Sequence, residues 1–597
     1  MKFLLKVAPV FPVCLLVLYI CIYPEFELRQ TPKGAANPTV AFHDFDEVSY
    51  LSFAESLRVG APRKNNPYRR DLDVGNESLF SIQFIPPYVI AFTSYILGIG
   101  IDSSFILICT LCGLFAAVAI FALILSLTSD NIIAGLGAMV ILSFGTALSG
   151  LGAFYQLLDI ADIPTFIPFQ RRYNPAFGFP FMFIFFLTVW KTVSSKNVRI
   201  GNIYAALSAV LFNLLLYSYF YLWSGALAWL VILFLLLTYL RPANIEKTDL
   251  KRLFILLLLC TVSLIPYFFL IGNMNIGSDL VLLQKTRVPV TFDQYTVPGL
   301  LALIVAGVVC AFKRNLIKSR QFIFALAFLL LPLAVFNQQI LTGYSLQPFH
   351  YGRFVTNYTV ILGAIIICAE LIRNYTSGVW WYIFVVTIAI SSVGWTFNEQ
   401  IVNQNVQRRY SEKFSNTMPV NRYLEANGGG DKKEALTTLN LEIFQAELQN
   451  VYAPNPVLWN WHMSAFGGMT AQENRRRLFA LLYFADVKPE MFEKRVSNCA
   501  DMSLCVWLFG GKVIATHSIG GRQIDIQEIE AVIGQYQDFY LSFDKNTAFK
   551  PLLGAVIISK NGNSRLYNLR RWYDVVDVKT FPNHILFEIR AKHDNRY

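Results

Sequence analysis

The sequence predicts a polytopic α-helical membrane protein with a small α+β domain at its carboxyl end. Hydrophobic residues make up 55% of the 597 residues and charged residues only 15%, and the mean hydropathy is +0.46. Soluble globular chains carry about 25% charged residues. From residue 399 onward the composition changes, with charges of both signs and alternating apolar runs. We therefore expect a membrane module at 1–398 and an extracytoplasmic domain, the tail, at 399–597.

Eleven apolar segments are predicted to span the membrane. They lie at about 7–23, 103–128, 132–154, between Pro175 and Lys191, at 202–219, 221–240, from Arg252 to Ile271, at 297–312, 321–337, from Phe354 to Arg373, and at 379–397. The first could also be a cleaved signal peptide, but it lacks an A-x-A site and contains Pro9 and Pro12, which favours an uncleaved span. The run FIPPYVIAFTSYILGIG is short for a crossing and is expected to lie in the membrane interface.

Basic residues set the predicted orientation. They cluster in every second loop, on the same side as Lys2 and Lys6. Such residues are retained in the cytoplasm, so the net charge of +11 is a topology signal, and no nucleic-acid partner is predicted. An odd number of spans then places the tail outside a cytoplasmic (inner) membrane. The first loop, 24–102, and the second loop, 155–175, lie on that same outer side.

Within the tail, the runs AVIISK and HILFEIRAK alternate as strands do, and Ala471–Val496 is predicted as helix. Cys499 and Cys505 could form a disulfide if the tail is extracytoplasmic. The other seven cysteines fall in apolar spans, where they are expected to pack as small hydrophobes.

The first loop contains the most informative stretch, AFHDFDEVSYLSFAESLRVG, with Asp44, Asp46 and Glu47 close together. Adjacent like charges raise one another's pKa, so one of Asp46 and Glu47 could take a proton while the other keeps its charge. That is the outline of a general base. The alternative is a solvated acidic turn before an amphipathic helix.

Other polar residues are predicted to lie on the same outer face and could complete a site. The candidates are Asp159, Asp162, Arg171, Arg172 and Asn174 in the second loop, Lys285 and Arg287 in a later loop, and His350 and Arg353 in another. Such a site would pair a catalytic carboxylate with cations for an anionic group, and the arginine fork suits phosphate. The alternatives are headgroup anchoring for the two adjacent arginines, a loop-capped histidine, and solvated charges at Lys285 and Arg287.

The order FDEVSYLSFAESLRVG, then ESLFSIQFIPPYVIAF, resembles the first loop of the GT-C glycosyltransferases. The nearest groups are the protein O-mannosyltransferases and the lipid A aminoarabinose transferases, and the resemblance covers roughly the first 200 residues. Two departures are visible. Ile85 stands where the aminoarabinose transferases carry a lysine that contacts phosphate, and the tail lacks the W-W-D signature of oligosaccharyltransferases.

The resemblance implies an inverting transfer of a sugar from a polyprenyl-phosphate donor to the hydroxyl of a lipid, glycan or protein acceptor. Asp46 and Glu47 match the family's first-loop acid, and a second acid falls near Asp159 or Asp162. No zinc-ligand spacing occurs in the sequence, although a divalent cation is compatible with the acids.

Two other functions remain open at the sequence level. A transporter or flippase of lipid-linked glycans would need ionisable groups inside the spans, which here are nearly free of them. A non-catalytic protein of envelope assembly would use the loop acids only as surface. We expect a glycosyltransferase of cell-envelope glycan biosynthesis.

Overall fold

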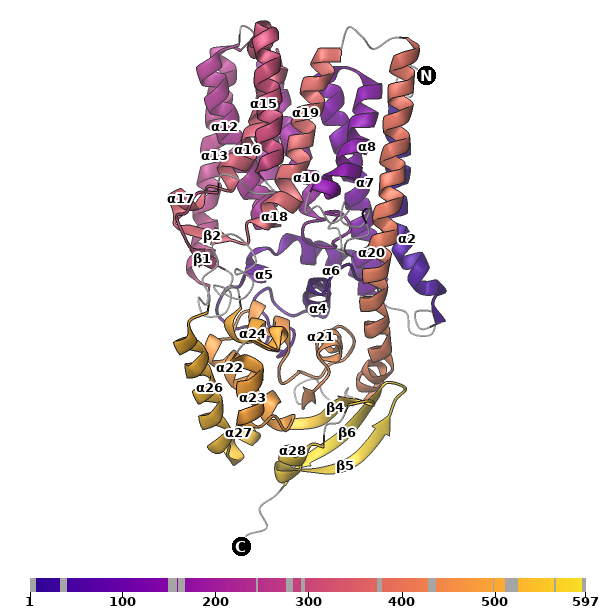
Figure 1. The fold of residues 1–597 in the computed structure, drawn as a ribbon, viewed down its shortest axis with the longest axis vertical. Helices are drawn as coiled ribbons and strands as arrows, with labels where there is room; N and C mark the ends of the chain where they lie inside the picture. The colour runs from indigo at the N-terminus through magenta and orange to yellow at the C-terminus, as the bar shows by residue number, and fades with distance from the viewer. Residues whose placement is uncertain are drawn as a thin grey trace.

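The computed structural model describes residues 7–32, 40–148, 158, 167–242, 245–274, 283–290, 296–372, 378–427, 436–497, 499–510, 524–562 and 565–592. A bundle of long helices forms one half of the molecule and the tail forms the other (Figure 1). Between them lie the short helices of the first loop. The predicted combination of an α-helical bundle with a carboxyl-terminal α+β domain is confirmed.

In the part of the chain that the structure describes, eight helices are long and apolar enough to cross a membrane. They are α2 (Val10–Gln30), α7 (Ile101–Thr128), α11 (Val198–Leu216), α12 (Phe220–Leu240), α13 (Lys247–Gly272), Arg320–Thr342, Phe349–Ile372 and α20 (Val379–Asn427). Three further predicted spans correspond to shorter apolar helices, namely α8 (Asn131–Leu148), α10 (Gly178–Ser194) and α15 (Val297–Phe312). The count of eleven spans therefore remains a prediction.

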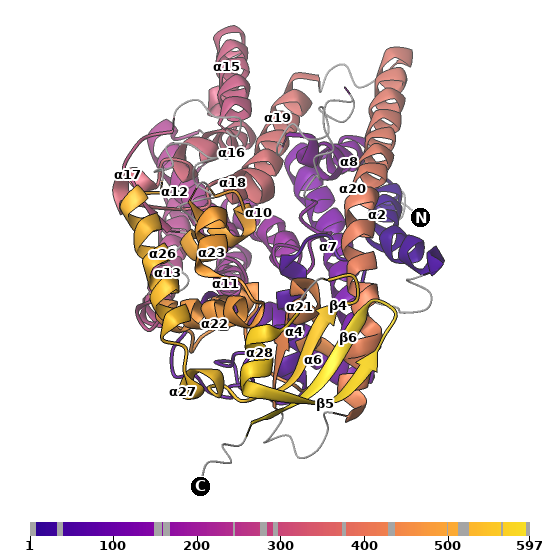
Figure 2. The same ribbon diagram turned by 60° about the horizontal axis from the view of Figure 1, so that its bottom comes forward.

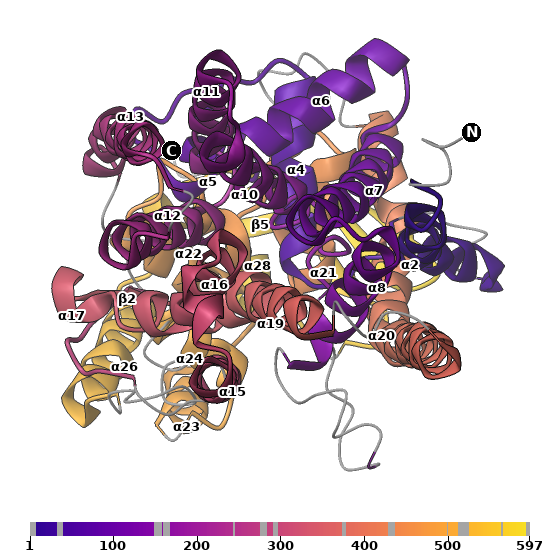
Figure 3. The same cartoon turned by 90° about the horizontal axis from the view of Figure 1, so that it is seen from above.

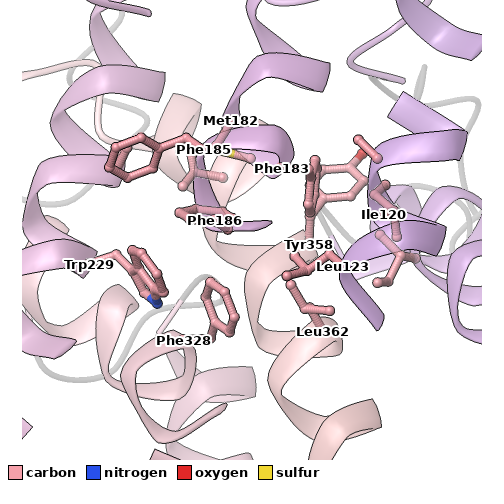
Figure 4. Close-up of a cluster of buried hydrophobic side chains, with 14 of the residues drawn as sticks. Ile120, Leu123, Met182, Phe183, Phe185, Phe186, Trp229, Phe328, Tyr358 and Leu362 are labelled. Atoms are coloured by element: carbon pink, nitrogen blue, oxygen red, sulfur yellow. The ribbon is translucent and has the colours of Figure 1, made fainter. Parts of the chain in front are cut away.

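The centre of the bundle is packed by aromatic side chains. Helix α10 lies inside the bundle when it is viewed from above (Figure 3). Its Phe186 ring lies 4.6 Å from Trp229 of α12, and Trp229 stacks at 5.0 Å on Phe328 of α16 (Arg320–Val335). On the other side Phe179 meets Tyr358 of α19 (Asn357–Ile372) at 5.1 Å. Figure 4 shows this cluster of buried rings. This packing fixes the relative positions of the helices that lead into the second loop and residues 349–356.

The FIPPY segment forms α6 (Ile85–Leu97). Two prolines stand at its start, where a missing backbone N–H breaks no helical hydrogen bond, and Gly98 ends it in the left-handed conformation. Pro86, Ile90 and Ala91 are buried, whereas Tyr95 is 78% exposed. Figure 3 shows α6 lying across the ends of the long helices and not along them. An uncovered apolar face on a helix in this orientation fits the predicted interfacial position.

The first loop continues from α2 into α4 (Asp46–Arg58). Asp44 initiates this helix, because its Oδ1 accepts hydrogen bonds from the backbone N–H groups of Asp46 and Glu47 at 3.1 and 3.3 Å. After α4 come α5 (Leu79–Ile82) and α6. Figure 1 places α4 between the helix bundle and the tail.

Helix α20 joins the membrane module to the tail without a break at the predicted border of 398 and 399. Near its far end Val420 and Leu424 pack on Ile557 and Leu586 of the tail sheet. Figure 2 shows this sheet beside the lower part of α20. The connection is thus a continuous helix, and the division into two domains at 398 remains a prediction.

The tail sheet has four strands in the order β3-β4-β6-β5, where β3 is parallel to β4 and the other pairs are antiparallel. The strands are β3 (Thr437–Asn440), β4 (Leu553–Ser559), β5 (Tyr573–Thr580) and β6 (His584–Ala591). Both strands predicted in the tail, AVIISK and HILFEIRAK, are confirmed as β4 and β6.

Helices surround the sheet. They are α21 (Ile443–Tyr452), η4 (Trp461–Ala465), α22 (Ala471–Phe484), α23 (Pro489–Val496), α24 (Met502–Phe509), α26 (Ile526–Leu541), α27 (Lys545–Ala548) and α28 (Tyr567–Trp572). The single helix predicted at Ala471–Val496 is wrong in one respect. The segment forms two helices, because Asp486 has a positive φ of 60° and Pro489 starts a new helix. The Cys499–Cys505 disulfide is present.

Labelling of engineered cysteines tests the predicted orientation. A membrane-impermeant maleimide added from outside should modify a cysteine placed beside Asn427, at the end of α20, and should not modify one beside Lys318. The parent protein, with its seven free cysteines, gives the background. Protection of the cysteine at Asn427 together with labelling of the one at Lys318 would show that the predicted topology is inverted.

Candidate active site

A cavity of about 530 Å³ lies where the helix bundle, the first loop and the tail meet. Its walls come from α4, the second loop, the start of α12, residues 347–353, and the tail segments 459–478 and 506–510. Six of the predicted site residues line it, namely Asp44, Asp46, Arg171, Asn174, His350 and Arg353. The predicted convergence of separate outer loops on one place is therefore observed for these six.

Arg171 is the centre of the polar wall. Its Nε donates to Asp44 and its Nη2 to Asp46, while Nη1 donates to the Asn174 carbonyl at 3.1 Å. The side chain is only 4% exposed, and its guanidinium lies 5.6 Å from the Tyr50 ring. All three nitrogens are thus engaged, so Arg171 orients the two first-loop carboxylates.

The neighbouring Arg172 points away from the cavity into a buried cluster. It pairs with Glu25 of α2 and with Glu47 at 3.4 Å, and its Nη1 donates to the Ala41 carbonyl at 2.8 Å. Glu47, which is 0% exposed, also accepts backbone hydrogen bonds from Arg172 at 2.7 Å and His43 at 2.8 Å. Among the described residues, Arg172 and Glu47 do not line the cavity. Their geometry is that of a structural tie between α2, the first loop and the second loop.

The pKa values of Asp46 and Glu47 diverge, but the cause is not that each carboxylate raises the pKa of the other. Burial raises the pKa of Glu47 to about 8 against the opposing charge of Arg172, and Asp44 adds to the rise. Desolvation also opposes ionisation of Asp46, but the hydrogen bond from His462 and the charge of Arg171 outweigh it and hold its pKa below the usual range. The expectation that Glu47 makes Asp46 more basic is therefore wrong.

Asp46 is the acid that faces the cavity. Its side chain is 50% exposed, whereas that of Asp44 is 20% exposed and is engaged by the backbone at the start of α4 and by Arg171. Of the predicted catalytic acids that the structure describes, Asp46 is thus the one with room for a substrate hydroxyl.

The tail supplies two functional residues that the sequence analysis did not find. His462 of η4 places its Nε2 3.2 Å from Oδ1 of Asp46, and its Nδ1 3.0 Å from Oε2 of Glu447 in α21. Glu447 is fully buried and also accepts from the Tyr68 hydroxyl at 2.9 Å. The available signal was a histidine that directly follows a tryptophan in W-N-W-H-M, in a chain with six histidines.

The first loop also holds the backbone of the histidine-bearing segment. Asn66 donates to the carbonyls of Met463 and Gly467 at 3.0 and 3.2 Å. Arg69 donates to the Gly468 carbonyl at 2.6 Å. Gly467 and Gly468 lie so close to the first loop that a Cβ on either would meet Val74 at about 2.5 Å or slightly more. The loop that bears Asp46 thus also positions His462.

His350 and Arg353 line the cavity from the bundle side. His350 Nδ1 lies 3.3 Å from the Tyr219 hydroxyl and its ring 4.7 Å from Tyr221, so its neighbours are tyrosines and not only a loop carbonyl. Arg353 lies in a π-helical turn, η3 (Gly352–Thr356), with its guanidinium 5.0 Å from the Phe349 ring. Single π turns of this kind are frequent at functional sites.

The remaining predicted residues are not brought to the cavity by the described structure. Asp159 and Asp162 lie outside the described residues. Lys285 is in strand β1 (Leu283–Lys285), which pairs with β2 (Tyr344–Leu346). Arg287 follows it and donates to the Ile340 carbonyl at 2.7 Å. Arg287 is not among the described residues that line the cavity.

The described residues do not fit a divalent cation. Among them no group of three or more His, Cys, Asp or Glu side chains is arranged to hold a metal ion. Asp44 and Asp46 already share a cation, the guanidinium of Arg171. We therefore derive no step through a metal.

Comparisons with known proteins are distant. No family model and no curated protein matches. The chain is similar over 93% of its length to 70% of the apo oligosaccharyltransferase of Archaeoglobus fulgidus, with 10% identity and a TM-score of 0.49. It is similar over 98% of its length to 98% of apo ArnT from Cupriavidus metallidurans, with 10% identity and a TM-score of 0.41. An ArnT structure with undecaprenyl phosphate gives 0.37, at 10% identity and 97% of both chains.

Both neighbours are GT-C glycosyltransferases, the group that the first loop resembles. Their TM-scores lie below 0.5, so no activity is carried over from them. The function proposed below depends on the residues of the cavity.

Thermal unfolding distinguishes the structural acid from the cavity acid. Glu47→Gln should lower the unfolding free energy by about 1–3 kcal/mol, because the amide nitrogen that replaces one buried oxygen cannot accept the backbone hydrogen bond which that oxygen receives from Arg172 or His43. Asp46→Asn should cost at most about 1 kcal/mol, since its side chain is half exposed and Arg171 keeps Asp44. The unfolding midpoints of the two purified variants give the comparison. A larger loss in Asp46→Asn would contradict this assignment.

Proposed function

We propose that the protein is a glycosyltransferase that moves a sugar from a polyprenyl-phosphate donor to an acceptor hydroxyl on the extracytoplasmic side of the membrane. The observation that carries the proposal is a half-exposed carboxylate, Asp46, held between Arg171 and His462 in a cavity at the junction of bundle and tail. Both a membrane-bound donor and a water-soluble or membrane-bound acceptor could reach such a place.

Asp46 would act on the acceptor hydroxyl. The hydroxyl oxygen attacks the anomeric carbon, the bond from that carbon to the phosphate oxygen breaks, and the electron pair leaves with the polyprenyl phosphate. Because the pKa of Asp46 is lowered, it is always ionised at neutral pH but is a weak base. The proton therefore moves to Asp46 late, when the new carbon–oxygen bond has made the hydroxyl acidic. The negative charge of the Asp46 carboxylate also faces the positive charge that develops on the sugar as the bond to phosphate breaks.

Arg353 and His350 would bind the donor phosphate. They line the cavity from the helix bundle, the side from which a lipid tail would enter. Arg171 is held by Asp44 and Asp46, and Arg172 by Glu25 and Glu47, so their forks are committed to the protein. Of the three arginines expected to bind phosphate, namely Arg171, Arg172 and Arg353, we retain Arg353, because it lines the cavity from the helix bundle and its charge would stabilise the departing phosphate.

The geometry favours transfer over the alternative functions. A flippase would need a polar path across the bundle, yet the core around α10 is filled by packed aromatic rings. A protein that only assembles envelope components would have no need of a carboxylate paired with two cations inside a cavity. The acceptor class, whether lipid, glycan or protein, is left open by the walls of the cavity.

Complementation tests the role of Asp46. In cells that lack the protein, mass spectrometry of glycans and glycolipids should show the loss of one sugar from an envelope product. Restoring Asp46→Asn should leave that sugar missing, with turnover at least about a hundredfold below the parent, because the variant keeps its shape but removes the base. Asp73→Asn, an exposed acid of the same loop paired with Lys64, is the matched control and should restore the product. Parental product levels with Asp46→Asn would refute the proposal.

Binding of undecaprenyl phosphate by the purified protein tests whether Arg353 binds the donor phosphate. Arg353→Ala should weaken binding by about ten- to a hundredfold, since a charge-assisted hydrogen bond contributes about 1.5–3 kcal/mol, and Arg353→Lys should recover only part of it. Arg287→Ala is the control, because Arg287 bonds to the Ile340 carbonyl and is not among the described residues that line the cavity. Equal affinities for the parent and Arg353→Ala would assign the phosphate to other cations.

A further inference from the structure

One chain of polar contacts connects the tail core to the cavity. Asp46, His462 and Glu447 form a carboxylate–imidazole–carboxylate series, with contacts of 3.2 Å at Nε2 and 3.0 Å at Nδ1. The three residues come from α4, η4 and α21. Both ring nitrogens thus face acceptors.

This geometry decides the charge of His462. A carboxylate can only accept hydrogen bonds, so an imidazole between two of them satisfies both when each nitrogen carries a proton. Glu447 is held as a carboxylate by donors on the other side, the Tyr68 hydroxyl at 2.9 Å and the backbone N–H of His462 at 3.1 Å. Asp46 is held as a carboxylate by Arg171.

We infer that His462 is a permanently charged positioning residue through which the tail completes the active site. Its imidazolium, anchored by Glu447, keeps Asp46 ionised and fixes the oxygen that faces the cavity. This inference deepens the proposed function and depends on it for the role of Asp46, but the charge of His462 can be measured without any substrate.

The electrostatic surroundings agree with this inference. The charged and titratable groups around His462 are Asp46 from α4, Glu447 from α21 and Tyr68 from the first loop, with Arg171 behind Asp46. Burial alone would lower the pKa of His462, but Glu447 and Asp46 outweigh burial and raise it to about 10. The imidazolium is therefore present at neutral pH and is lost only as pH rises toward that value.

Removing the anchor should make this charge sensitive to pH. In Glu447→Gln the amide oxygen can still accept from the backbone N–H of His462, while the amide nitrogen, at the place of Oε2, can donate to Nδ1 and to the Tyr68 hydroxyl oxygen, so a neutral imidazole would keep its hydrogen bond to Asp46. The pKa of His462 should then fall from the parental value toward the ordinary value of about 6.5, because Glu447 no longer raises it and only Asp46 still opposes burial. A residue that only packs would show no such change.

The direct test is a pH titration of the purified full-length protein with ¹⁵N-labelled histidine, followed by NMR. The chain has six histidines, and His462→Gln identifies the signal of interest. In the parent, His462 should stay protonated from pH 6 to 9. In Glu447→Gln it should titrate within this pH range, nearer to the ordinary value of about 6.5. Titration of parental His462 near its ordinary pKa, or an unchanged signal in Glu447→Gln, would overturn the inference.

A second variant covers the case in which Glu447→Gln does not fold. Asp46→Asn alters only a half-exposed group and should lower the pKa of His462 from the parental value, since one of its two carboxylate partners is lost. An identical titration in the parent and Asp46→Asn would show that the contact with Asp46 does not exist in solution.

The activity test separates this inference from the proposed function. In Glu447→Gln, product formation in cells or membranes should fall roughly tenfold or more between pH 6 and pH 8, following loss of the imidazolium, while the parent stays level. Glu442→Gln, on the residue that precedes the same helix, is the matched control and should follow the parent. A level profile in Glu447→Gln, with the NMR result as expected, would refute the positioning role. Absence of any transfer by the parent would refute the proposed function and leave the NMR result standing.

Discussion

The site depends on two consecutive arginines that point in opposite directions. Arg171 holds Asp44 and Asp46 at the cavity, and Arg172 holds Glu25 and Glu47 in the interior. Removing one partner from a buried ion pair costs about 3–5 kcal/mol, because a charge is left without compensation in a poorly polar environment. The second loop therefore fastens the first loop to α2 and, with the same backbone turn, sets the place of Asp46, the proposed general base.

The tail adds a second contact to Asp46, the carboxylate that Arg171 already holds. Helix α20 carries the chain from the bundle to the sheet without a flexible joint, and the first loop grips the segment around His462 through Asn66 and Arg69. Asp46 and His462 are far apart in sequence and meet at 3.2 Å. Arg353, proposed to bind the donor, and His462 of the tail thus both lie on helical elements around the Asp46 carboxylate.

The sequence predicted those features that local patterns determine. Apolar length predicted the helices of the bundle and set the shorter FIPPY run, which forms α6, apart from them, and alternation predicted β4 and β6. It could not predict which of two adjacent arginines faces the cavity, because their opposite directions follow from the turn at Arg171–Asn174 and from partners in other elements. For the same reason the sequence pairing of Asp46 with Glu47 was misleading, and His462, which functions only through tertiary contacts, was missed.

The most direct measurement of the central claim is a double-mutant cycle between Arg171 and Asp44, read from the unfolding free energy of the purified protein. Arg171→Met alone leaves two carboxylates without their shared cation, whereas Asp44→Asn alone leaves Arg171 with Asp46. If the arginine organises the first loop, the double variant should recover stability relative to the sum of the single losses, with a coupling of about 1–3 kcal/mol. Losses that simply add would contradict the account, because the two residues would then not interact.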